Sequence, residues 1–366
     1  MSEPRSKRRR TWVFAALLFA QFVLLLLVFE LVLAWFFPVS YRRPREAVPG
    51  HVWSQLLHRK STVPGLSYEL NPGTSAELRG AQISVNSLGF RGPEISAVKP
   101  SNTVRIVAMG ASVAFGWTVS NEESYPGHLE RRLNERAKGT DRKYEVLNFG
   151  VGGYSTRDEV AALEGKALAL DPDLVIIDFH PNGPESEPVQ PLHQVFHEPE
   201  WWENWNVLRL LAHGRRQWGI WTLGGGEQYR YLASPEGPHW PTLLKAYDKA
   251  QALCEPRGVP VIIVIFPTLG NRKLWSEYPF ADIHAQVIAA ATERGFVPVD
   301  ILPVYTNSGY DVPTIAADAE HPNSLGLDLA AAELERVIVS RHEELLKLPP
   351  PGPAVDPKLT SDPAPR

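Results

Sequence analysis

The chain begins with a long apolar run and continues, after a stretch rich in Pro and Gly, as short apolar runs that alternate with amphipathic segments. Residues 12–37 are apolar except for Gln21 and Glu30. As an α-helix this run would be about 39 Å long at roughly 1.5 Å per residue, whereas the hydrocarbon core of a bilayer is about 30 Å thick. Aromatic residues at both ends of the run, Trp12 and Trp35 among them, suit the two membrane interfaces. The pattern therefore predicts a transmembrane helix.

Two other structures share this kind of N-terminal pattern. A cleaved signal peptide has a shorter apolar region that ends in small residues at an A-x-A-like site, whereas this run ends in Ala34-Trp35-Phe36-Phe37-Pro38. A buried core helix of this length would normally carry more polar positions. We therefore interpret residues 1–45 as a cytoplasmic tip and an uncleaved signal anchor.

Positive charge predicts the orientation of the anchor. Five Lys or Arg residues precede the span and three, namely Arg42, Arg43 and Arg45, follow it. Because cytoplasmic flanks carry the excess of positive charge, we expect the N-terminus in the cytoplasm. The body of the chain would then lie on the extracytoplasmic side, periplasmic or extracellular, as part of a single-pass membrane protein.

Residues 46–102 differ from both of their neighbours in composition. They are rich in Pro, Gly and polar residues, with short β-like patterns at 66–71 and 81–86 and a turn at 89–92. We interpret this segment as a linker followed by a small β extension packed on the main domain.

From residue 103 the pattern alternates between strand and helix. Apolar runs at 104–109, 144–149, 173–179, 259–266 and 297–301 predict strands, and helical spacing at 125–136, 158–170, 241–255, 281–294 and 324–346 predicts helices. Strands that are apolar throughout and alternate with helices indicate a parallel sheet covered on both faces. The sequence thus predicts an α/β domain over residues 103–348, with a doubly wound parallel sheet of about five strands.

Two segments do not fit this alternation. Residues 184–240 form an insertion that holds six of the eleven tryptophans, namely Trp201, Trp202, Trp205, Trp218, Trp221 and Trp240. They would form either the core of a subdomain or a surface, such as a lid, a sugar platform or a membrane contact. Residues 349–366 contain seven prolines and are predicted to be a disordered tail.

Composition and charge restrict the class of protein further. The net charge of −4 conceals an asymmetry, because residues 1–45 hold eight basic and two acidic residues while the remainder holds 29 basic and 39 acidic. An acidic body without a basic stripe argues against nucleic acid as a partner. The single cysteine, Cys254, excludes an intrachain disulfide and a Cys-based structural zinc site. The oligomeric state is not predicted by any of these features.

Candidate chemistry gathers at the carboxyl ends of the predicted strands, where open parallel sheets bind their ligands. Ser112 follows the first strand, the glycine-rich turn with Gly153 the second, and His180 and Asn182 the third. A further segment, Asp318-Ala319-Glu320-His321-Pro322-Asn323, precedes the last helix. Together they offer the nucleophile, the oxyanion donors, the base and the base-orienting carboxylate of an acyl-transfer site. His180 is in addition a candidate contact of the substrate.

Other catalytic and binding motifs are absent from the sequence. Residues 110–116 do not form a dinucleotide or phosphate loop. The Gly-x-Ser-x-Gly elbow is missing because position 114 is Ala. His193 and His197 have the spacing of metal ligands, but they lie in a Pro-rich segment without an obvious third ligand. We therefore expect no metal and no cofactor.

The order of these motifs resembles that of the SGNH, or GDSL-like, hydrolase superfamily, and the resemblance extends over about residues 103–346. It depends on Gly-x-Ser after the first strand, Asn-x-Gly-x-x-Gly after the second, Asn182 after the third and Asp-x-x-His-Pro-Asn before the last helix. The resemblance implies that Ser112 is the nucleophile, His321 the general base and Asp318 its orienting carboxylate. It also implies an oxyanion hole made by the N–H groups of Ser112 and Gly153 and by the Asn182 side chain.

Two positions depart from the family pattern. The family usually has Asp between Gly110 and Ser112, where this chain has Ala111, and it usually has Asp after the loop Asn, where this chain has Gly183. The expected function is a serine esterase that acts on an O-acyl ester of a carbohydrate or lipid at the outer side of the membrane. Two alternatives stay open, which are an O-acyltransferase of cell-envelope glycans and an inactive carbohydrate-binding or assembly protein on the same fold.

Overall fold

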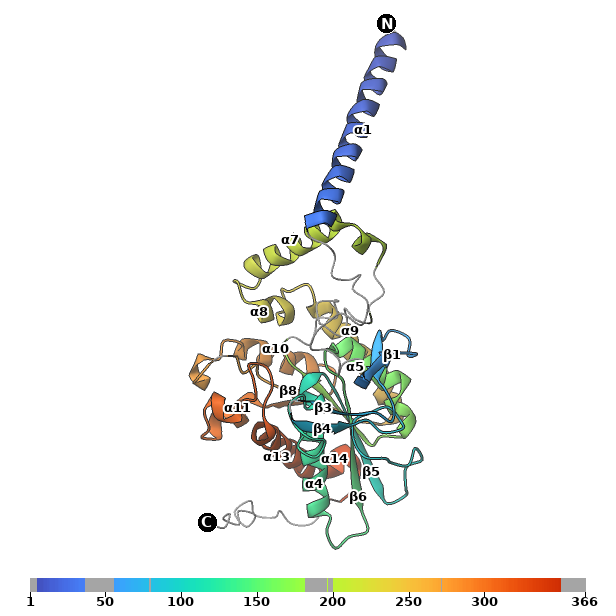
Figure 1. Ribbon diagram of the computed structural model, residues 1–366. Helices are drawn as coiled ribbons and strands as arrows, with labels where there is room; N and C mark the ends of the chain where they lie inside the picture. The colour runs from blue at the N-terminus through green and yellow to red at the C-terminus, as the bar shows by residue number, and fades with distance from the viewer. Residues whose placement is uncertain are drawn as a thin grey trace.

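The computed structural model describes residues 5–36, 56–78, 80–181, 196, 200–270 and 272–349. Its centre is a five-stranded parallel sheet with the strand order β6-β5-β7-β8-β9 (Figure 1). The strands are β5 (Thr103–Gly110), β6 (Lys143–Gly150), β7 (Leu174–Phe179), β8 (Val261–Ile265) and β9 (Val297–Asp300). Since β6 and β7 flank β5 on opposite sides, the topological switch point lies at the carboxyl end of β5.

Helices cover both faces of the sheet, which confirms the predicted doubly wound fold. Alternate residues of each strand serve the two faces, so that Val107 and Met109 of β5 enter one core and Ile106 and Ala108 the other. The first core is completed by α5 (Thr156–Gly165), α9 (Trp240–Cys254) and α10 (Ala281–Thr292), and the second by α4 (Tyr125–Arg136) and α13 (Ser324–Ser340).

Two of the predicted helices are interrupted. The helix expected over 324–346 is divided at Arg341 into α13 and α14 (His342–Leu346), and the helix expected over 158–170 becomes α5 followed by a 3₁₀ turn, η2 (Ala167–Leu170). The remaining short helices of the described chain are α3 (Ser112–Phe115), η3 (Trp201–Asn204), α8 (Gln228–Ala233), η4 (Glu255–Arg257), η5 (Trp275–Glu277), α11 (Leu302–Asn307) and α12 (Val312–Ile315).

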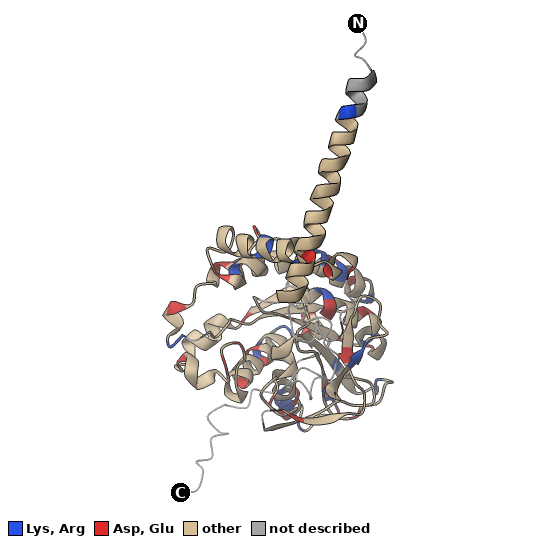
Figure 2. Cartoon of the chain, turned by 45° about the horizontal axis from the view of Figure 1, so that its top comes forward, with Lys and Arg blue, Asp and Glu red and all other residues tan. Residues whose placement is uncertain are grey.

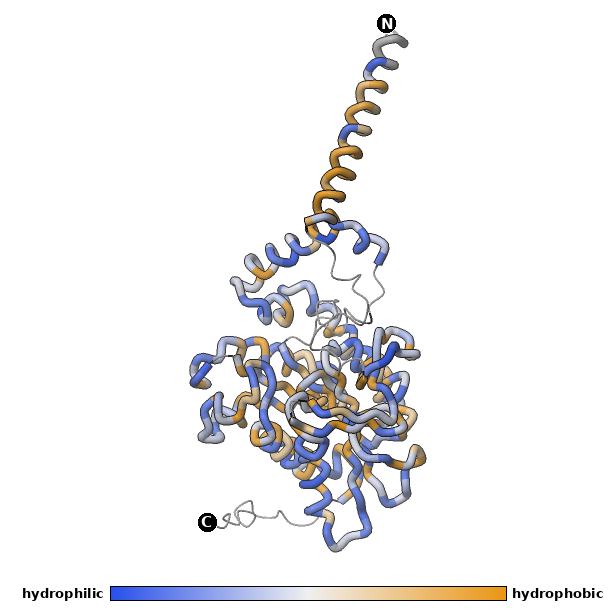
Figure 3. The backbone as a smooth tube through the Cα atoms, in the orientation of Figure 1, coloured by the Kyte–Doolittle hydropathy of each residue, from blue (hydrophilic) through white to orange (hydrophobic). Residues whose placement is uncertain are grey.

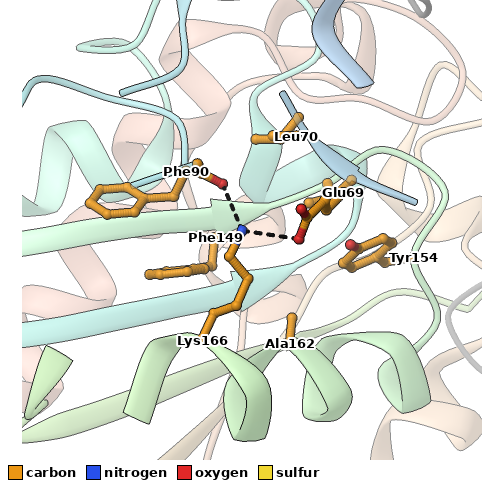
Figure 4. A pocket seen from close by; sticks show the side chains of 9 residues that line it. Glu69, Leu70, Phe90, Phe149, Tyr154, Ala162 and Lys166 are labelled. Atoms are coloured by element: carbon orange, nitrogen blue, oxygen red, sulfur yellow. Dashed lines mark hydrogen bonds and ion pairs between the residues drawn. The ribbon is translucent and has the colours of Figure 1, made fainter. Parts of the chain in front are cut away.

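Two antiparallel hairpins precede the sheet. They pair β1 (His58–Lys60) with β2 (Tyr68–Leu70) and β3 (Ser75–Leu78) with β4 (Ala81–Ser84), and their apolar side chains join the core on the α5 side. A small pocket marks the seam between this β extension and α5 (Figure 4). There Lys166 Nζ lies 3.3 Å from Glu69 Oε2 and 3.4 Å from the carbonyl oxygen of Gly89. The β extension is thus joined to the α/β domain by polar contacts as well as by apolar packing.

The N-terminal helix α1 (Arg5–Phe36) extends away from the α/β domain (Figure 1). Its segment Arg10–Phe36 is long and apolar enough to cross a membrane (Figure 3). Little of this segment is buried. Figure 2 shows this helix almost entirely without charged residues, and Glu30 is the one acidic residue in its sequence. At the level of Glu30 lies α7 (Asn206–Thr222), whose first backbone N–H groups bond to the Glu30 carboxylate, Asn206 N at 2.7 Å and Val207 N at 2.9 Å.

Several expectations stay predictions. The domain boundaries derived from the sequence are not tested. The predicted tail beyond residue 349, the linker at 46–55 and residues 184–195 and 197–199 of the Trp-rich insertion lie outside the described residues.

Candidate active site

Three side chains from two loops form one hydrogen-bonded line at the carboxyl edge of the sheet. Ser112 is the first residue of α3, directly after β5, and His321 and Asp318 lie in the loop before α13. Ser112 Oγ is 2.9 Å from His321 Nε2, and His321 Nδ1 is 2.8 Å from Asp318 Oδ1. The His321 side chain is 12% exposed and that of Asp318 29%, so the line borders solvent. These distances match a nucleophile, a base and an orienting carboxylate.

The Asp318 carboxylate also organises the backbone of its own loop. Its Oδ1 accepts hydrogen bonds from the N–H groups of Glu320 and His321, both at 2.9 Å. Burial alone would raise the pKa of Asp318, but the bonds from the His321 ring and from these two N–H groups outweigh burial and hold the pKa well below its usual range. The carboxylate is therefore charged throughout the neutral range, as a partner of an imidazolium needs to be.

The last residue of the Asp-x-x-His-Pro-Asn motif has a structural task. Asn323 is the N-cap of α13, and its side chain accepts a hydrogen bond from Gly326 N at 3.1 Å. The cap begins the helix immediately after His321, which fixes the end of the loop that carries the imidazole.

Aromatic and hydrogen-bonding contacts hold the His321 loop from outside. The Trp117 ring stacks on the His321 ring with centroids 6.0 Å apart and an interplanar angle of 19°. Tyr229 of α8 donates a hydrogen bond to Glu320 Oε1 at 2.8 Å. The His321 imidazole is thus oriented by the Asp318 carboxylate and by the stacked Trp117 ring, while Tyr229 holds the adjacent residue of the loop.

Asp178 of β7 supports the nucleophile turn. Its side chain is buried, and its two oxygens accept from the backbone N–H groups of Ala111 at 3.2 Å and Ala114 at 3.1 Å. Ala111 is the N-cap of α3 and has no capping side chain. Asp178 therefore supplies from a neighbouring strand the anchor that a cap residue normally supplies from within the helix. Burial raises the pKa of Asp178 to about 7, against the opposing effect of these two hydrogen bonds.

Two glycines and an asparagine explain why the turn fits between its neighbours. A Cβ on Gly110 would lie 2.1 Å from Asp178 Oδ2, and a Cβ on Gly150 would lie 2.2 Å from Phe115 N. Asn148 of β6 donates from Nδ2 to the carbonyl oxygen of Ala114 at 2.8 Å. Gly110 and Gly150 are thus required by close approach, and Asn148 joins Ala114 of α3 to the neighbouring strand β6.

The β extension reaches the same turn through Arg91. The buried guanidinium donates to the backbone carbonyls of Phe115, Gly116 at 2.7 Å and Val119, and to Asn121 Oδ1 at 2.8 Å. Burial lowers the pKa of Arg91 to about 9, although the negative charges of Glu122 and Glu123 oppose the shift. The turn 89–92, expected only as a turn, therefore clamps the carboxyl end of α3.

A second contact of the extension orients the predicted oxyanion donor. Tyr68 Oη donates to the carbonyl oxygen of Gly152 at 2.8 Å, and Tyr154 Oη donates to the carbonyl oxygen of Tyr68 at 2.7 Å. In a trans peptide the N–H points opposite to the C=O, so fixing the Gly152 carbonyl fixes the direction of the Gly153 N–H. Gly153 has φ +80°, a conformation that favours glycine.

The remaining site predictions have different outcomes. His180 is buried at the end of β7, and its ring meets the Tyr229 ring edge-on at a centroid distance of 6.2 Å. Its contact with substrate stays a prediction. Asn182, the expected side-chain donor, lies outside the described residues, as do His193 and His197. Within the described part of the chain, no group of three or more His, Cys, Asp or Glu residues could hold a metal ion.

Sequence reasoning missed Asp178, Arg91, Tyr68 and Trp117. For Asp178 a signal was present, because a carboxylate within an otherwise apolar buried strand requires partners. The others gave no such signal, since their partners are backbone carbonyls or rings that only the tertiary structure brings near.

Comparisons with known proteins agree with this fold. The chain belongs to the GDSL-like Lipase/Acylhydrolase family, whose model matches residues 108–329, and it is a hydrolase of ester bonds. A search of curated proteins finds no match.

Solved structures with a similar fold include a catalytic mutant of an acetylxylan esterase from Geobacillus stearothermophilus. It is 15% identical, with a TM-score of 0.40, and the match covers 66% of this chain and 96% of that one. A lipase/acylhydrolase from Enterococcus faecalis is 17% identical, with a TM-score of 0.40, over 65% of this chain and 96% of that one.

Proposed function

We propose that this chain is a serine esterase that forms an acyl-enzyme on Ser112. The observation that carries the proposal is the unbroken line from Ser112 Oγ to His321 Nε2, at 2.9 Å, and from His321 Nδ1 to Asp318 Oδ1, at 2.8 Å. A base within hydrogen-bond reach activates a hydroxyl that is otherwise a weak nucleophile. The Asp318 carboxylate holds the tautomer with its proton on Nδ1 and stabilises the imidazolium.

The proposed reaction has two half-reactions. His321 Nε2 takes the Ser112 hydroxyl proton while Oγ bonds to the ester carbonyl carbon, and the carbonyl π electrons move to the oxygen. The N–H groups of Ser112 and Gly153 and the Asn182 amide are the proposed donors to that oxyanion. Collapse expels the alcohol, which takes the proton from His321. Water then repeats the sequence, releases the carboxylic acid and restores Ser112.

The proposed setting is the outer side of a membrane crossed by α1, with an O-acyl group of a carbohydrate or a lipid ester as substrate. The apolar segment Arg10–Phe36 and the excess of basic residues before it support this topology. In spheroplasts or intact vesicles, external protease should digest the body of the chain, and the mature N-terminus should retain Arg8–Arg10. A soluble product that begins beyond Phe37 would contradict the anchored topology.

Labelling with a fluorophosphonate tests the chemistry. The wild-type protein should be labelled, the adduct should map to Ser112, and Ser112→Ala should abolish labelling. Ser120→Ala, a serine outside the hydrogen-bonded line, is the matched control and should be labelled like the wild type. A folded wild-type protein that takes no label would contradict the proposal and favour a binding or assembly role. An added sugar acceptor that diverts the acyl group from water would identify a transferase instead.

A further inference from the structure

Helix α7 carries an exposed apolar stripe along its length. At about 100° per residue, one side of the helix is formed by Val207, Leu210, Leu211, Gly214, Trp218 and Trp221. Leu211 is 63% exposed, Trp218 66% and Trp221 68%. Four large apolar side chains exposed on one side of a helix, those of Leu210, Leu211, Trp218 and Trp221, mark a contact surface rather than an ordinary solvated face. We refer to these six positions as the α7 stripe.

The stripe points away from the α/β domain, because the other side of α7 packs toward it. Gly219 is buried against Tyr231 of α8, and a Cβ on Gly219 would lie 2.5 Å from Tyr231 Cε2. The Arg216 guanidinium lies over the same ring, 5.9 Å from its centroid. Figure 1 shows α8 between α7 and the domain, with α1 rising from the other side of α7.

The position of α7 is fixed relative to α1. The Glu30 carboxylate accepts hydrogen bonds from Asn206 N at 2.7 Å, Asn206 Nδ2 at 2.6 Å and Val207 N at 2.9 Å. The carboxylate therefore occupies the end of α7 where unbonded N–H groups and the positive end of the helix dipole favour an anion. Leu33, about one turn further along α1, is buried.

Residue 30 is also where α1 should leave the hydrocarbon core. A core of about 30 Å takes up about 20 residues at 1.5 Å each. Counted from Arg10, the first residue of the apolar segment, the core ends near Glu30. The contact between Glu30 and the start of α7 therefore lies at the boundary between acyl chains and headgroups on the side of the catalytic domain.

The composition of α7 suits that boundary. Its tryptophans are the residues that prefer the headgroup level. His213 and Arg215 are exposed on the remaining circumference of the helix, where they can reach lipid phosphates. An apolar face with aromatic residues, bordered by basic residues, is typical of a helix that lies in the membrane plane.

We infer that α7 is an interfacial helix that inserts its stripe into the outer leaflet of the bilayer that α1 crosses. The ligand of the stripe is the lipid surface itself. This binding reaches the catalytic loop, because α8 packs under α7 and its Tyr229 bonds to Glu320, the neighbour of His321, at 2.8 Å. Through α7 and α8 the membrane thus holds the catalytic site at a fixed distance from its surface. This inference does not depend on whether the site hydrolyses an ester.

Site-directed fluorescence on the full chain tests the inference. The single native cysteine is removed by Cys254→Ala, and one cysteine is placed at Leu211, Trp218 or Trp221 and labelled with an environment-sensitive fluorophore. The protein is reconstituted in phosphatidylcholine vesicles that contain a minority of phosphatidylglycerol and lipids spin-labelled either near the headgroup or near the chain end. An interfacial helix buries its apolar face about 5–10 Å deep. The stripe labels should therefore lose about half of their emission to the headgroup quencher and less to the chain-end quencher.

Three control positions separate the outcomes. A label at Phe19, near the middle of the span, should be quenched most by the chain-end lipid, which shows that α1 is inserted. Labels at Ala212, on the opposite side of α7, and at Val98, at the amino-terminal edge of the sheet, should be quenched little. If Phe19 is quenched but the stripe labels show water-like emission, the inference is wrong. If they show blue-shifted emission without lipid quenching, protein covers the stripe, and the inference is again wrong.

Discussion

Replacement of Asp178 by Asn tests whether the buried carboxylate positions the nucleophile. The carboxylate accepts from Ala111 N at 3.2 Å and from Ala114 N at 3.1 Å, through different oxygens. An Asn side chain has the same shape but only one accepting oxygen, so one of the two N–H groups would face an NH₂ group. Ser112 lies between these two anchors, and its backbone should shift.

The magnitude follows from the lost contact. A hydrogen bond to a charged group contributes about 1.5–3 kcal/mol, and about 1.4 kcal/mol corresponds to a tenfold change in rate. Asp178→Asn should therefore lower kcat for a soluble aryl ester by about 10- to 100-fold. KM should change little, because the turn positions the attacking oxygen rather than the bound ester.

Although Asp178→Asn should lower kcat, it should not lower the stability of the protein at high pH. Burial raises the pKa of Asp178 to about 7, so the folded state binds this proton more tightly than the unfolded chain. The native state therefore loses stability as pH rises from about 4 to about 7. The Asn variant lacks this dependence, and its melting temperature at pH 8 should equal or exceed that of the wild type. General damage to the fold would instead lower activity and melting temperature together.

Glu159→Gln is the matched control for this experiment. Glu159 is buried on α5, and burial followed by the charges of Asp178 and Asp158 raises its pKa. The substitution removes a buried carboxyl whose charged form burial disfavours, and it leaves both bonds of Asp178 to the turn in place. It should leave kcat unchanged and should not lower stability at pH 8. Asp178→Asn with a kcat within twofold of the wild type would refute the positioning role.

Three further predictions concern the site. Ser112→Ala, His321→Ala and the double variant should lose kcat by similar factors, about 10⁴ or more, because residues that act as a unit are not additive; single-turnover kinetics on the three variants checks this. Asp318→Asn should lower kcat by about 10²–10⁴-fold. It should also lower the free energy of unfolding at pH 7 but not at a pH below the depressed Asp318 pKa, where the wild type has lost the same contribution. Tyr68→Phe removes the bond to the Gly152 carbonyl and should lower kcat about tenfold with KM unchanged, as steady-state kinetics would show; an unchanged kcat would mean that the loop holds its shape without the bond.

The sequence predicted the sheet because parallel strands are apolar on both faces. Runs such as 173–179 and 259–266 cannot be exposed on either side, so their order along the chain with intervening helices determined the doubly wound fold. Strands β1 and β3 were not predicted, since His-Arg-Lys and Ser-Ala-Glu-Leu have no strand pattern of their own and pair only with neighbours in the extension. The break at Arg341 was missed for a similar reason, because the apolar spacing continues through it.

The candidate site was predictable where topology alone brings residues together. The carboxyl ends of adjacent parallel strands must share one edge, so Ser112 and the glycine-rich loop could be placed side by side. The clamps on that site were not predictable, because Arg91 and Tyr68 act on backbone atoms that lie 24 and 84 residues away in the sequence. The Ala111 departure illustrates the difference. Ala111 has no side chain that could form a hydrogen bond within the motif. The nucleophile turn is held instead by Asp178 on another strand.

The surroundings of the Trp-rich insertion could not be predicted from its hydrophobic pattern alone. An amphipathic helix with a tryptophan stripe has the same sequence signature whether the stripe is buried in a subdomain or in lipid. What favours burial in lipid is a contact over 176 residues, from Glu30 to Asn206, which joins the start of α7 to the proposed membrane span at the level where that span would leave the acyl chains. The same contact explains an acidic residue in an otherwise apolar span, because Glu30 meets the N–H groups of α7 instead of hydrocarbon. The acidic residue Glu30 in the apolar segment and the exposed apolar stripe on α7 are thus accounted for by the same contact between the two helices.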